Sequence, residues 1–314
     1  MPILKQLVMC VLLAVAATAS AQHFPTKPIR IIAPFPPGGS VDFTARVVAP
    51  KLAESLGQQV VIDNRSGASG NIGSELAARA APDGYTLLAN TLPYVTNGFL
   101  YSRMAYDVTR DFVPLSVLAS SPAMLVVHPS VPVKSVRELV QLAKNKPGML
   151  SYASSGPGSN HHIAGELINY LAKVEIVHIH FKGGGPAAVA NLSGEVGLNW
   201  PNVMQAVPFI KTGRIRGLGV TSAKRSKATP DVPAIAESGV AGLEGYDFTP
   251  WQIMAAPAGT PATIVALLNE HLVKAMRSPE VADRMARDGA FGQKSGRESQ
   301  YRAAHNPRAA NRRP

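Results

Sequence analysis

The chain has 314 residues, 46% of them hydrophobic, which suits two α/β domains of ordinary size. Its formal net charge is +11 at pH 7, but the Lys and Arg residues are scattered and do not alternate with aromatic residues as in a nucleic-acid-binding module. We therefore expect an anionic small molecule or an anionic surface as the partner, and no nucleic acid.

Residues 1–21 have the composition of a secretory signal peptide. Lys5 precedes an apolar run over residues 7–17, and the small residues Ala-Ser-Ala at 19–21 form a cleavage site. The run is shorter than the about 20 apolar residues that a membrane-spanning helix needs. Cleavage would also remove Cys10, the single cysteine, and with it any disulfide or thiol chemistry. The sequence thus predicts a periplasmic protein that begins near Gln22 after export through the inner membrane.

Strand-like and helix-like segments alternate from residue 29 onward, the pattern of an α/β protein with mostly parallel sheets. Gly57 is placed to end the first helix, and Ser135 to cap the start of a later one. We expect strands at 29–35, 59–63, 85–90, 117–128, 150–153, 174–181 and 215–221, and helices at 43–56, 71–80, 135–144, 163–171, 186–192, 203–211, 261–277 and 279–287.

Two of the extended runs, 117–128 and 215–221, bracket a middle block that has its own set of strands and helices. We expect them to cross between two lobes. The first lobe would then comprise residues 22–122 and 224–292, and the second residues 123–223. A cleft between lobes is a preferred place for a small-molecule site.

Three glycine-rich loops stand where a strand leads into a helix, at residues 36–40, 154–162 and 182–186. Glycine lets the backbone approach a ligand closely, and the first turn of a helix has N–H groups without an intrahelical acceptor. The helix dipole adds attraction for carboxylate or phosphate. One such loop is an ordinary tight connection, whereas three together favour an anion site.

The glycines at 67–73 follow a strand and precede a helix, but their spacing is GxxGxxG and not the GxGxxG of a dinucleotide fingerprint. A metal site is also disfavoured, because neither HExxH nor a cysteine-containing pattern is present. We therefore expect neither a cofactor nor a metal ion. The residues that invited the metal interpretation are His161, His162, Glu166, His178 and His180.

An exported serine hydrolase is an alternative, because Ser155 and Ser159 lie close in sequence to His161. The chain lacks the G-x-S-x-G elbow, and neighbours in sequence need not form a triad. The prediction is a binding protein and not an enzyme, with Ser159 as a hydrogen-bond donor to ligand or a helix cap.

Eight segments form a specific set: 24–42 (FPTKPIRIIAPFPPGGSVD), 64–73 (NRSGASGNIG), 81–88 (APDGYTLL), 162–166 (HIAGE), 181–187 (FKGGGPA), 221–226 (TSAKRS), 230–233 (PDVP) and 256–261 (APAGTP). Together they resemble the Bug family, the TctC-like extracytoplasmic solute receptors of tripartite tricarboxylate transporters, over residues 24 to about 290. The resemblance implies a monomer with the two-lobed periplasmic-binding-protein (Venus flytrap) fold of the α/β class, its lobes joined by crossing strands.

The resemblance also implies how a ligand is held. The loop matching residues 35–42 and a second-lobe loop at 182–186 would grip a carboxylate through backbone groups and ordered water, while other residues line the cleft and set specificity. The ligand-binding residues expected on this basis are Phe35, Pro36, Pro37, Gly38, Gly39, Ser40, Asp42, Thr91, Ser155, Gly156, Ser159, Asn160, Lys182, Gly183, Gly184, Gly185, Pro201 and Asn202.

The implied function is capture of a small carboxylate and its delivery to the membrane permease subunits of a tripartite transporter. An exported sensor that acts on a membrane signalling partner is the alternative. Family members often carry Asp at the positions of Gly197 and Pro201, and its absence here favours simple carboxylates over amino acids. A second departure is the polar, Arg-rich segment 293–314, which we expect to be disordered and to leave the first lobe less stable.

Overall fold

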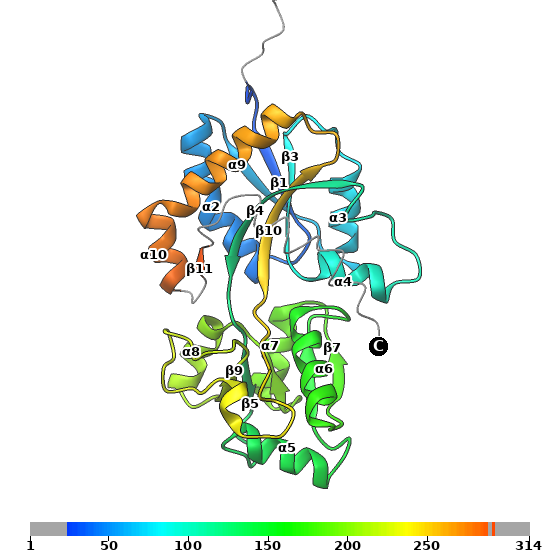
Figure 1. Cartoon of the computed structure of the whole chain (residues 1–314), viewed down its shortest axis with the longest axis vertical. Coiled ribbons are helices and arrows are strands. Elements are labelled where there is room, and N and C mark those ends of the chain that lie inside the picture. The colour runs from blue at the N-terminus through cyan, green and yellow to red at the C-terminus, as the bar shows by residue number, and fades with distance from the viewer. Residues whose placement is uncertain (1–23, 288–290, 293–314) are drawn as a thin grey trace, which may run out of the picture.

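A computed structural model describes residues 24–287 and 291–292 of the chain. The expected signal peptide and the expected disordered segment 293–314 lie outside the described residues. The described chain forms two lobes stacked along the longest axis of the molecule, each built on its own β-sheet (Figure 1). Among the described residues, no helix is both long enough and apolar enough to span a membrane.

The first lobe contains a six-stranded sheet in the order β11-β4-β10-β3-β1-β2. Strand β1 pairs in parallel with β2 and β3, whereas β10 runs antiparallel to both β3 and β4. The elements of this lobe are β1 (Ile29–Ala33), α2 (Ser40–Leu56), β2 (Val60–Asn64), η1 (Ala68–Gly70), α3 (Asn71–Ala78), β3 (Thr86–Asn90), α4 (Pro93–Leu100), β4 (Phe112–Ser120), β10 (Trp251–Pro257), α9 (Ala262–Arg277), α10 (Pro279–Arg287) and β11 (Phe291–Gly292).

Alternation along β1 divides the first lobe into two cores, because successive side chains of a strand point to opposite faces. Ile31 packs with residues of α2 and α9 on one face, and Ile32 packs with residues of α3 and α4 on the other. Figure 1 shows these helix pairs on opposite sides of the sheet. Because β1, β2 and β3 are parallel, the loops that follow them, including the one after β1, leave the sheet at the same end.

The second lobe contains a five-stranded sheet in the order β7-β6-β8-β5-β9. Residues of α5 and α6 pack on one face of it, and residues of α7 and α8 on the other. Its elements are β5 (Met124–Val127), α5 (Val136–Asn145), β6 (Ser151–Ser154), α6 (Asn160–Ala172), β7 (Val177–His180), α7 (Gly184–Ser193), β8 (Leu198–Asn199), α8 (Val203–Lys211), β9 (Arg216–Val220) and η2 (Ile235–Ser238).

The sheets are mixed and not mostly parallel, because the strands that carry the chain between lobes run against their neighbours. The expected single strand 117–128 is two strands, with β4 in the first sheet and β5 in the second. Pro122 lies in the connection between them, where its missing N–H costs no ladder hydrogen bond. The outward crossing therefore lies at residues 121–123.

The return crossing lies later than the sequence indicates. Strand β9, expected to cross between lobes, pairs antiparallel with β5 inside the second sheet. The chain then stays in the second lobe, where Leu243 and Tyr246 are buried in its core and the Tyr246 hydroxyl donates to the Ala164 carbonyl at 3.0 Å. The boundary expected at 223/224 is thus too early, and the chain re-enters the first sheet only at Trp251.

Several helices begin earlier than their apolar spacing indicates. Helix α2 begins at Ser40 and not at residue 43, α6 at Asn160 and not at 163, and α7 at Gly184 and not at 186. In each case the first turn is polar or glycine-rich, so it carries no apolar periodicity to read. Each of these first turns lies at the junction of the lobes.

Candidate functional site

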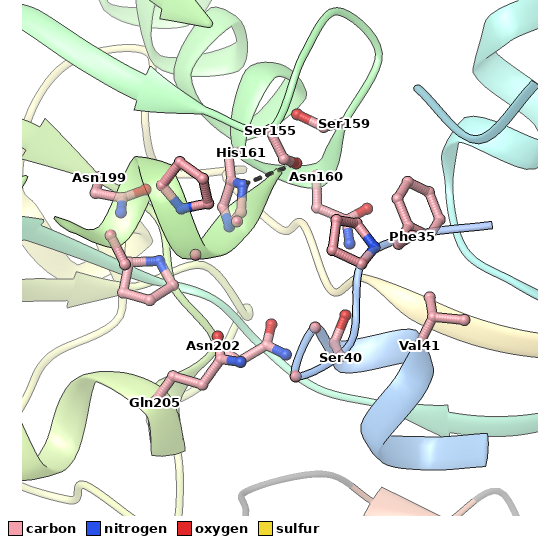
Figure 2. Close-up of a pocket in the computed structure, with 18 of the residues that line it drawn as sticks. Phe35, Ser40, Val41, Ser155, Ser159, Asn160, His161, Asn199, Asn202 and Gln205 are labelled. Atoms are coloured by element: carbon pink, nitrogen blue, oxygen red, sulfur yellow. Dashed lines mark hydrogen bonds between the residues drawn. The ribbon is translucent and has the colours of Figure 1, made fainter. Parts of the chain in front are cut away.

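A cavity of about 440 Å³ lies between the lobes, with walls from both of them (Figure 2). Fourteen of the eighteen expected ligand-binding residues line it, which does not test whether they bind a ligand. These are Phe35, Pro36, Pro37, Gly38, Gly39, Ser40, Thr91, Ser155, Ser159, Asn160, Gly184, Gly185, Pro201 and Asn202. The other four, Asp42, Gly156, Lys182 and Gly183, are not among the lining residues.

The first-lobe wall is built by the turn between β1 and α2. Gly38 adopts φ of +81°, a conformation that favours glycine, and Gly39 precedes the helix in an extended conformation without a side-chain cap. The backbone N–H groups of Ser40 and Val41 therefore have no intrahelical acceptor. Both residues line the cavity, so this helix start supplies N–H donors and a favourable dipole to an anion.

Asp42 supports this turn from behind and does not line the cavity. Its side chain is 4% exposed, accepts from the Gly38 N–H at 3.0 Å, and pairs with Arg46 at 2.9 Å. Asn64 bridges the same carboxylate and the Phe35 carbonyl, at 2.9 and 3.0 Å. Burial by itself raises the pKa of Asp42, but the hydrogen bonds from Arg46, Gly38 and Asn64 outweigh it and hold the pKa below its usual value. In this structure Asp42 positions the turn and is not among the residues that line the cavity.

The second-lobe wall includes the start of α7, which reaches the first lobe. Gly183 has φ of +126° and no side-chain cap for the helix, and Gly184 and Gly185 line the cavity. A Cβ atom at Gly183 would lie 3.2 Å from Cγ of Pro36, so the two glycine-rich loops meet across the junction. Gly183 thus lies where the two loops meet, and neither Gly183 nor Lys182 is among the lining residues.

The start of α6 links the lobes by hydrogen bonds. Asn160 Nδ2 donates to Thr91 Oγ1 at 3.3 Å, and that hydroxyl donates to the Trp251 carbonyl at 2.5 Å. One helix turn into α4, Thr96 Oγ1 donates to the Gly158 carbonyl at 3.0 Å. The loop of residues 154–159 is therefore held against the first lobe. Ser159 Oγ accepts from the His162 N–H at 3.3 Å, the helix-cap role.

His161 is the one titratable side chain among the cavity-lining residues that the structure describes. Its Nδ1 lies 3.3 Å from Ser155 Oγ, and burial lowers the pKa of its imidazole to about 4. The ring is therefore neutral at pH 7. Those same lining residues include no Asp or Glu that could orient His161 as the third member of a triad.

Among the residues that the structure describes, those that line the cavity include no Asp, Glu, Lys or Arg. A carboxylate in this cavity would depend on backbone N–H groups, amide side chains and helix dipoles. Pro201, one of the two positions at which the resembled family often carries Asp, lines the cavity. At the other position, Gly197, an added Cβ would lie 3.0 Å from Val131 Cγ2 in the second-lobe core.

His162, His178 and His180 lie near one another, and the described part of the chain contains no group of three or more His, Cys, Asp or Glu side chains that could hold a metal ion. The rings of His162 and His178 are 4.3 Å apart, and Tyr152 stacks on His178 with 5.1 Å between centroids. Burial, with a smaller effect of neighbouring His162, lowers the pKa of His178 to about 4. The glycines at 67–73 serve packing, since a Cβ at Gly73 would lie 2.6 Å from the Arg65 carbonyl oxygen.

Sequence reasoning missed the part of the cavity wall that comes from β8, α8 and the body of α7. The short strand β8 and the helix α8 expose one side to the cavity only because of how they pack, so no local pattern marks them. The missed lining residues are Val41, Pro93, His161, Pro186, Ala188, Asn191, Leu192, Asn199, Gln205, Phe209 and Ile215. Only Val41, His161 and Pro186 lie in the first turn of a helix that follows a glycine-rich loop, so only these three had a local signal in the sequence.

The chain matches a known receptor family over most of its length. Residues 44–304 match the family described as "Tripartite tricarboxylate transporter family receptor". The chain belongs to this family. The expected resemblance to Bug, or TctC-like, receptors is therefore confirmed.

Individual relatives agree with the family assignment. Protein BugT of Bordetella pertussis is 38% identical over 278 residues, which cover 88% of this chain and 84% of BugT. The structure of R. palustris Rpa4515 with adipate has a TM-score of 0.86 and 36% identity, covering 91% of this chain and 95% of Rpa4515. MatC from Rhodopseudomonas palustris with bound malate has a TM-score of 0.80 and 31% identity, covering 88% and 92%. The expected two-lobed periplasmic-binding-protein fold is thus confirmed.

Proposed function

We propose that this family member captures a small carboxylate in the cavity between its lobes and delivers it to the permease subunits of a tripartite transporter. The observation that carries the proposal is the cavity itself. It lies between the lobes, the uncapped starts of α2 and α7 contribute to its wall, and none of its lining residues in the described ranges 24–287 and 291–292 carries a charged side chain. Neighbours that bind adipate and malate support a carboxylate as ligand.

Neutral donors suffice for useful affinity. A hydrogen bond to a charged acceptor contributes about 1.5–3 kcal/mol, and a helix N-terminus about 0.3–1 kcal/mol more. Four or five such contacts reach the about −8 kcal/mol of micromolar binding after the entropic cost of association. The donors we assign are the N–H groups of Ser40 and Val41 in one lobe and of Gly184 and Gly185 in the other.

Because the donors come from both lobes, ligand binding would favour the closed arrangement. A ligand shifts a conformational equilibrium only by its differential affinity for the two states. The ligand class is a carboxylate without an ammonium group, since Pro201 offers no carboxylate partner to a positive charge.

The proposed setting is the periplasm. Residues 1–21 would direct export and be removed, and the mature monomer would meet membrane partners there. Uptake assays in proteoliposomes that contain the permease subunits test delivery: ligand transport that depends on the purified receptor supports it. Binding without stimulated uptake would instead point to the sensor role.

The carboxylate proposal is tested by thermal shift and calorimetry with mono-, di- and tricarboxylates and amino acids. Since a ligand that binds only the folded state stabilises it by RT ln(1 + [L]/Kd), a carboxylate should raise the melting temperature further as its concentration rises above Kd. A Ser155→Ala variant assayed on ester substrates accompanies the panel. Binding only of neutral or cationic compounds, or ester turnover that depends on Ser155, would overturn the proposal.

A further inference from the structure

We infer that Asn199 is a specificity-determining residue that donates its amide N–H to an acceptor oxygen at the far end of the ligand. The inference rests on the proposed function, because it assumes that a ligand carboxylate occupies the opposite side of the cavity at the start of α2. The ligand class it assigns is a carboxylate with a second oxygen acceptor, and not one that ends in a methyl or an ammonium group.

The orientation of the Asn199 amide is fixed by its neighbour. Its side-chain oxygen accepts from the Trp200 backbone N–H at 2.7 Å. Since an N–H can donate only to the amide oxygen, the NH2 group must occupy the other position. The residue is 2% exposed and lines the cavity, and none of the described residues accepts a hydrogen bond from Nδ2. The two N–H donors of this NH2 group are therefore left for a group inside the cavity.

A second asparagine in the same setting shows that this is unusual. Asn90 ends β3 as Asn199 ends β8, and its oxygen accepts from the next backbone N–H, that of Thr91, at 2.8 Å. Its Nδ2, however, donates to Ser74 Oγ at 2.9 Å. Asn90 does not line the cavity. The NH2 group of Asn90, away from the cavity, therefore has a partner within the protein. The NH2 group of Asn199, at the cavity, has no partner among the described residues.

The position of Asn199 matches a ligand held at both ends. Figure 2 shows Asn199, Asn202 and Gln205 along one side of the cavity and Phe35, Ser40 and Val41 along the other. Asn202 precedes α8 without capping it, so its amide is also free to face a ligand. The apolar side chains in the wall, among them Leu192, Phe209 and Ile215, suit the hydrocarbon body between two polar ends.

Because the described lining residues include no acidic side chain, this end of the cavity should favour a ligand that ends in an oxygen acceptor over one that ends in an ammonium group. An acceptor oxygen on the ligand accepts hydrogen bonds from the Asn199 NH2 group, whereas a methyl group leaves these donors unpaired. An ammonium group has only N–H donors and is repelled by them. Sites built to bind a polar group discriminate strongly against the analogue that lacks it.

The test compares linear ligands of matched length by calorimetry on the mature protein: dicarboxylates from succinate to suberate, their monoamides, the corresponding monocarboxylates and the ω-amino acids. We expect the dicarboxylate or the monoamide of one length to bind about 10-fold or more tightly than the monocarboxylate, with the ω-amino acid weakest. If the dicarboxylate binds more tightly than the monoamide, the group that accepts from Asn199 is a carboxylate; if the monoamide binds more tightly, it is an amide carbonyl. Equal affinity for the monocarboxylate overturns this inference alone, whereas no binding of any carboxylate overturns the proposed function.

The variant Asn199→Asp retains the oxygen that Trp200 needs and replaces the NH2 group by a second oxygen. We expect it to lose about 10-fold or more in dicarboxylate affinity and to gain affinity for the ω-amino acid, which reverses their order. Asn145→Asp, at the exposed end of α5, makes the same change of charge and should alter neither affinity.

If Asn199→Asp does not fold, Gln205→Glu decides the question. The side chain of Gln205 is exposed and lies on the same side of the cavity, so the charge is placed there without a folding cost. The same reversal of ligand order supports the inference. An unchanged order in a folded Asn199→Asp or Gln205→Glu variant overturns it.

Discussion

At the scale of single residues, the side chains that shape the site are not all in contact with the cavity. Asp42 is next to the N–H donors of α2 in sequence, yet its carboxylate holds Gly38, Arg46 and Asn64 behind the turn. A negative charge inside the cavity would repel the proposed ligand. The same carboxylate outside the cavity fixes the loop that presents the donors.

Asp42→Asn should destabilise the protein and weaken carboxylate binding, because the amide cannot accept all the hydrogen bonds that the carboxylate accepts. We expect a loss of about 1–3 kcal/mol in the free energy of unfolding at pH 7, measured by urea denaturation. A lowered folded-state pKa gives stability that is present above the unfolded value of about 3.9 and lost as the pH falls through the folded value. The difference from wild type should therefore vanish only below about pH 4.

The exposed Asp231→Asn is the matched control for that change. It removes the same charge away from the turn and should leave stability and affinity within error of wild type. Equal stability of Asp42→Asn and wild type at pH 7 would contradict the positioning role.

His161 gives the ligand-free protein a sensitivity to mild acid. Burial lowers the pKa of its ring to about 4, below the about 6.5 of the unfolded chain, so the unfolded state binds the proton first. Stability is then lost as the pH falls from about 6.5 towards 4. His161→Gln should remove about 1–2 kcal/mol of the loss between pH 7 and pH 5, measured by urea denaturation at both values. The part of the stability loss that comes from His178 should remain in the variant. An unchanged pH dependence of stability would contradict the role of His161.

At the scale of elements, the starts of helices carry the site. Helix α2 presents N–H groups that the chain does not cap, and α7 does the same from the other lobe, since a glycine precedes each of them. A serine or aspartate at either position would satisfy one of these donors and compete with a ligand. The glycines therefore keep the donors available as well as letting the loops approach.

Ser40→Pro tests the donor role of α2 without disturbing the helix. Proline is favoured at the first helical position, and Gly39 with φ of −75° and ψ of 167° is compatible with a following proline. The variant loses the Ser40 N–H and hydroxyl, whereas Ser40→Ala loses only the hydroxyl. We expect carboxylate affinity of the proline variant to be about 10-fold or more below that of the alanine variant, at similar melting temperatures, by calorimetry. Equal affinities would exclude the N–H as a ligand donor.

At the scale of the whole molecule, the lobes contact one another through groups outside the proposed donors. Thr96 Oγ1 binds the Gly158 carbonyl across the junction, and Leu100 lies so close to Gly158 that a Cβ there would be 2.7 Å from its Cδ1. Such contacts contribute to the closed arrangement without a ligand, and they raise the apparent affinity by increasing the fraction that is competent to bind.

Thr96→Val should shift the ligand-free protein towards open conformations, because the Gly158 carbonyl loses its partner. We expect a larger radius of gyration by small-angle X-ray scattering and an affinity for carboxylates a few-fold lower. Thr212→Val is the control, since Thr212 Oγ1 bonds only to carbonyls of its own helix in the second lobe. A ligand-free radius equal to that of wild type would contradict the role of Thr96.

The sequence by itself determined the fold class and the three glycine-rich loops. These features are local: alternating apolar patterns mark strands and helices, and a glycine before a polar first turn marks a helix start that can bind an anion. The turn at 36–40 could therefore be found before any packing was known, as could the helix cap at Ser159. The motifs spread along the chain also sufficed to identify the family.

The tertiary structure alone decided where the chain returns to the first lobe and which side chains face the cavity. The segment before Trp251 has single apolar residues between turns, and only their burial in the second-lobe core places it in that lobe. Asp42 faces away from the cavity and Asn199 into it, although the sequence favoured the first and overlooked the second. The reason is physical: a pattern along the chain records local geometry, whereas a free hydrogen-bond donor inside a cavity is defined by what distant segments leave unpaired.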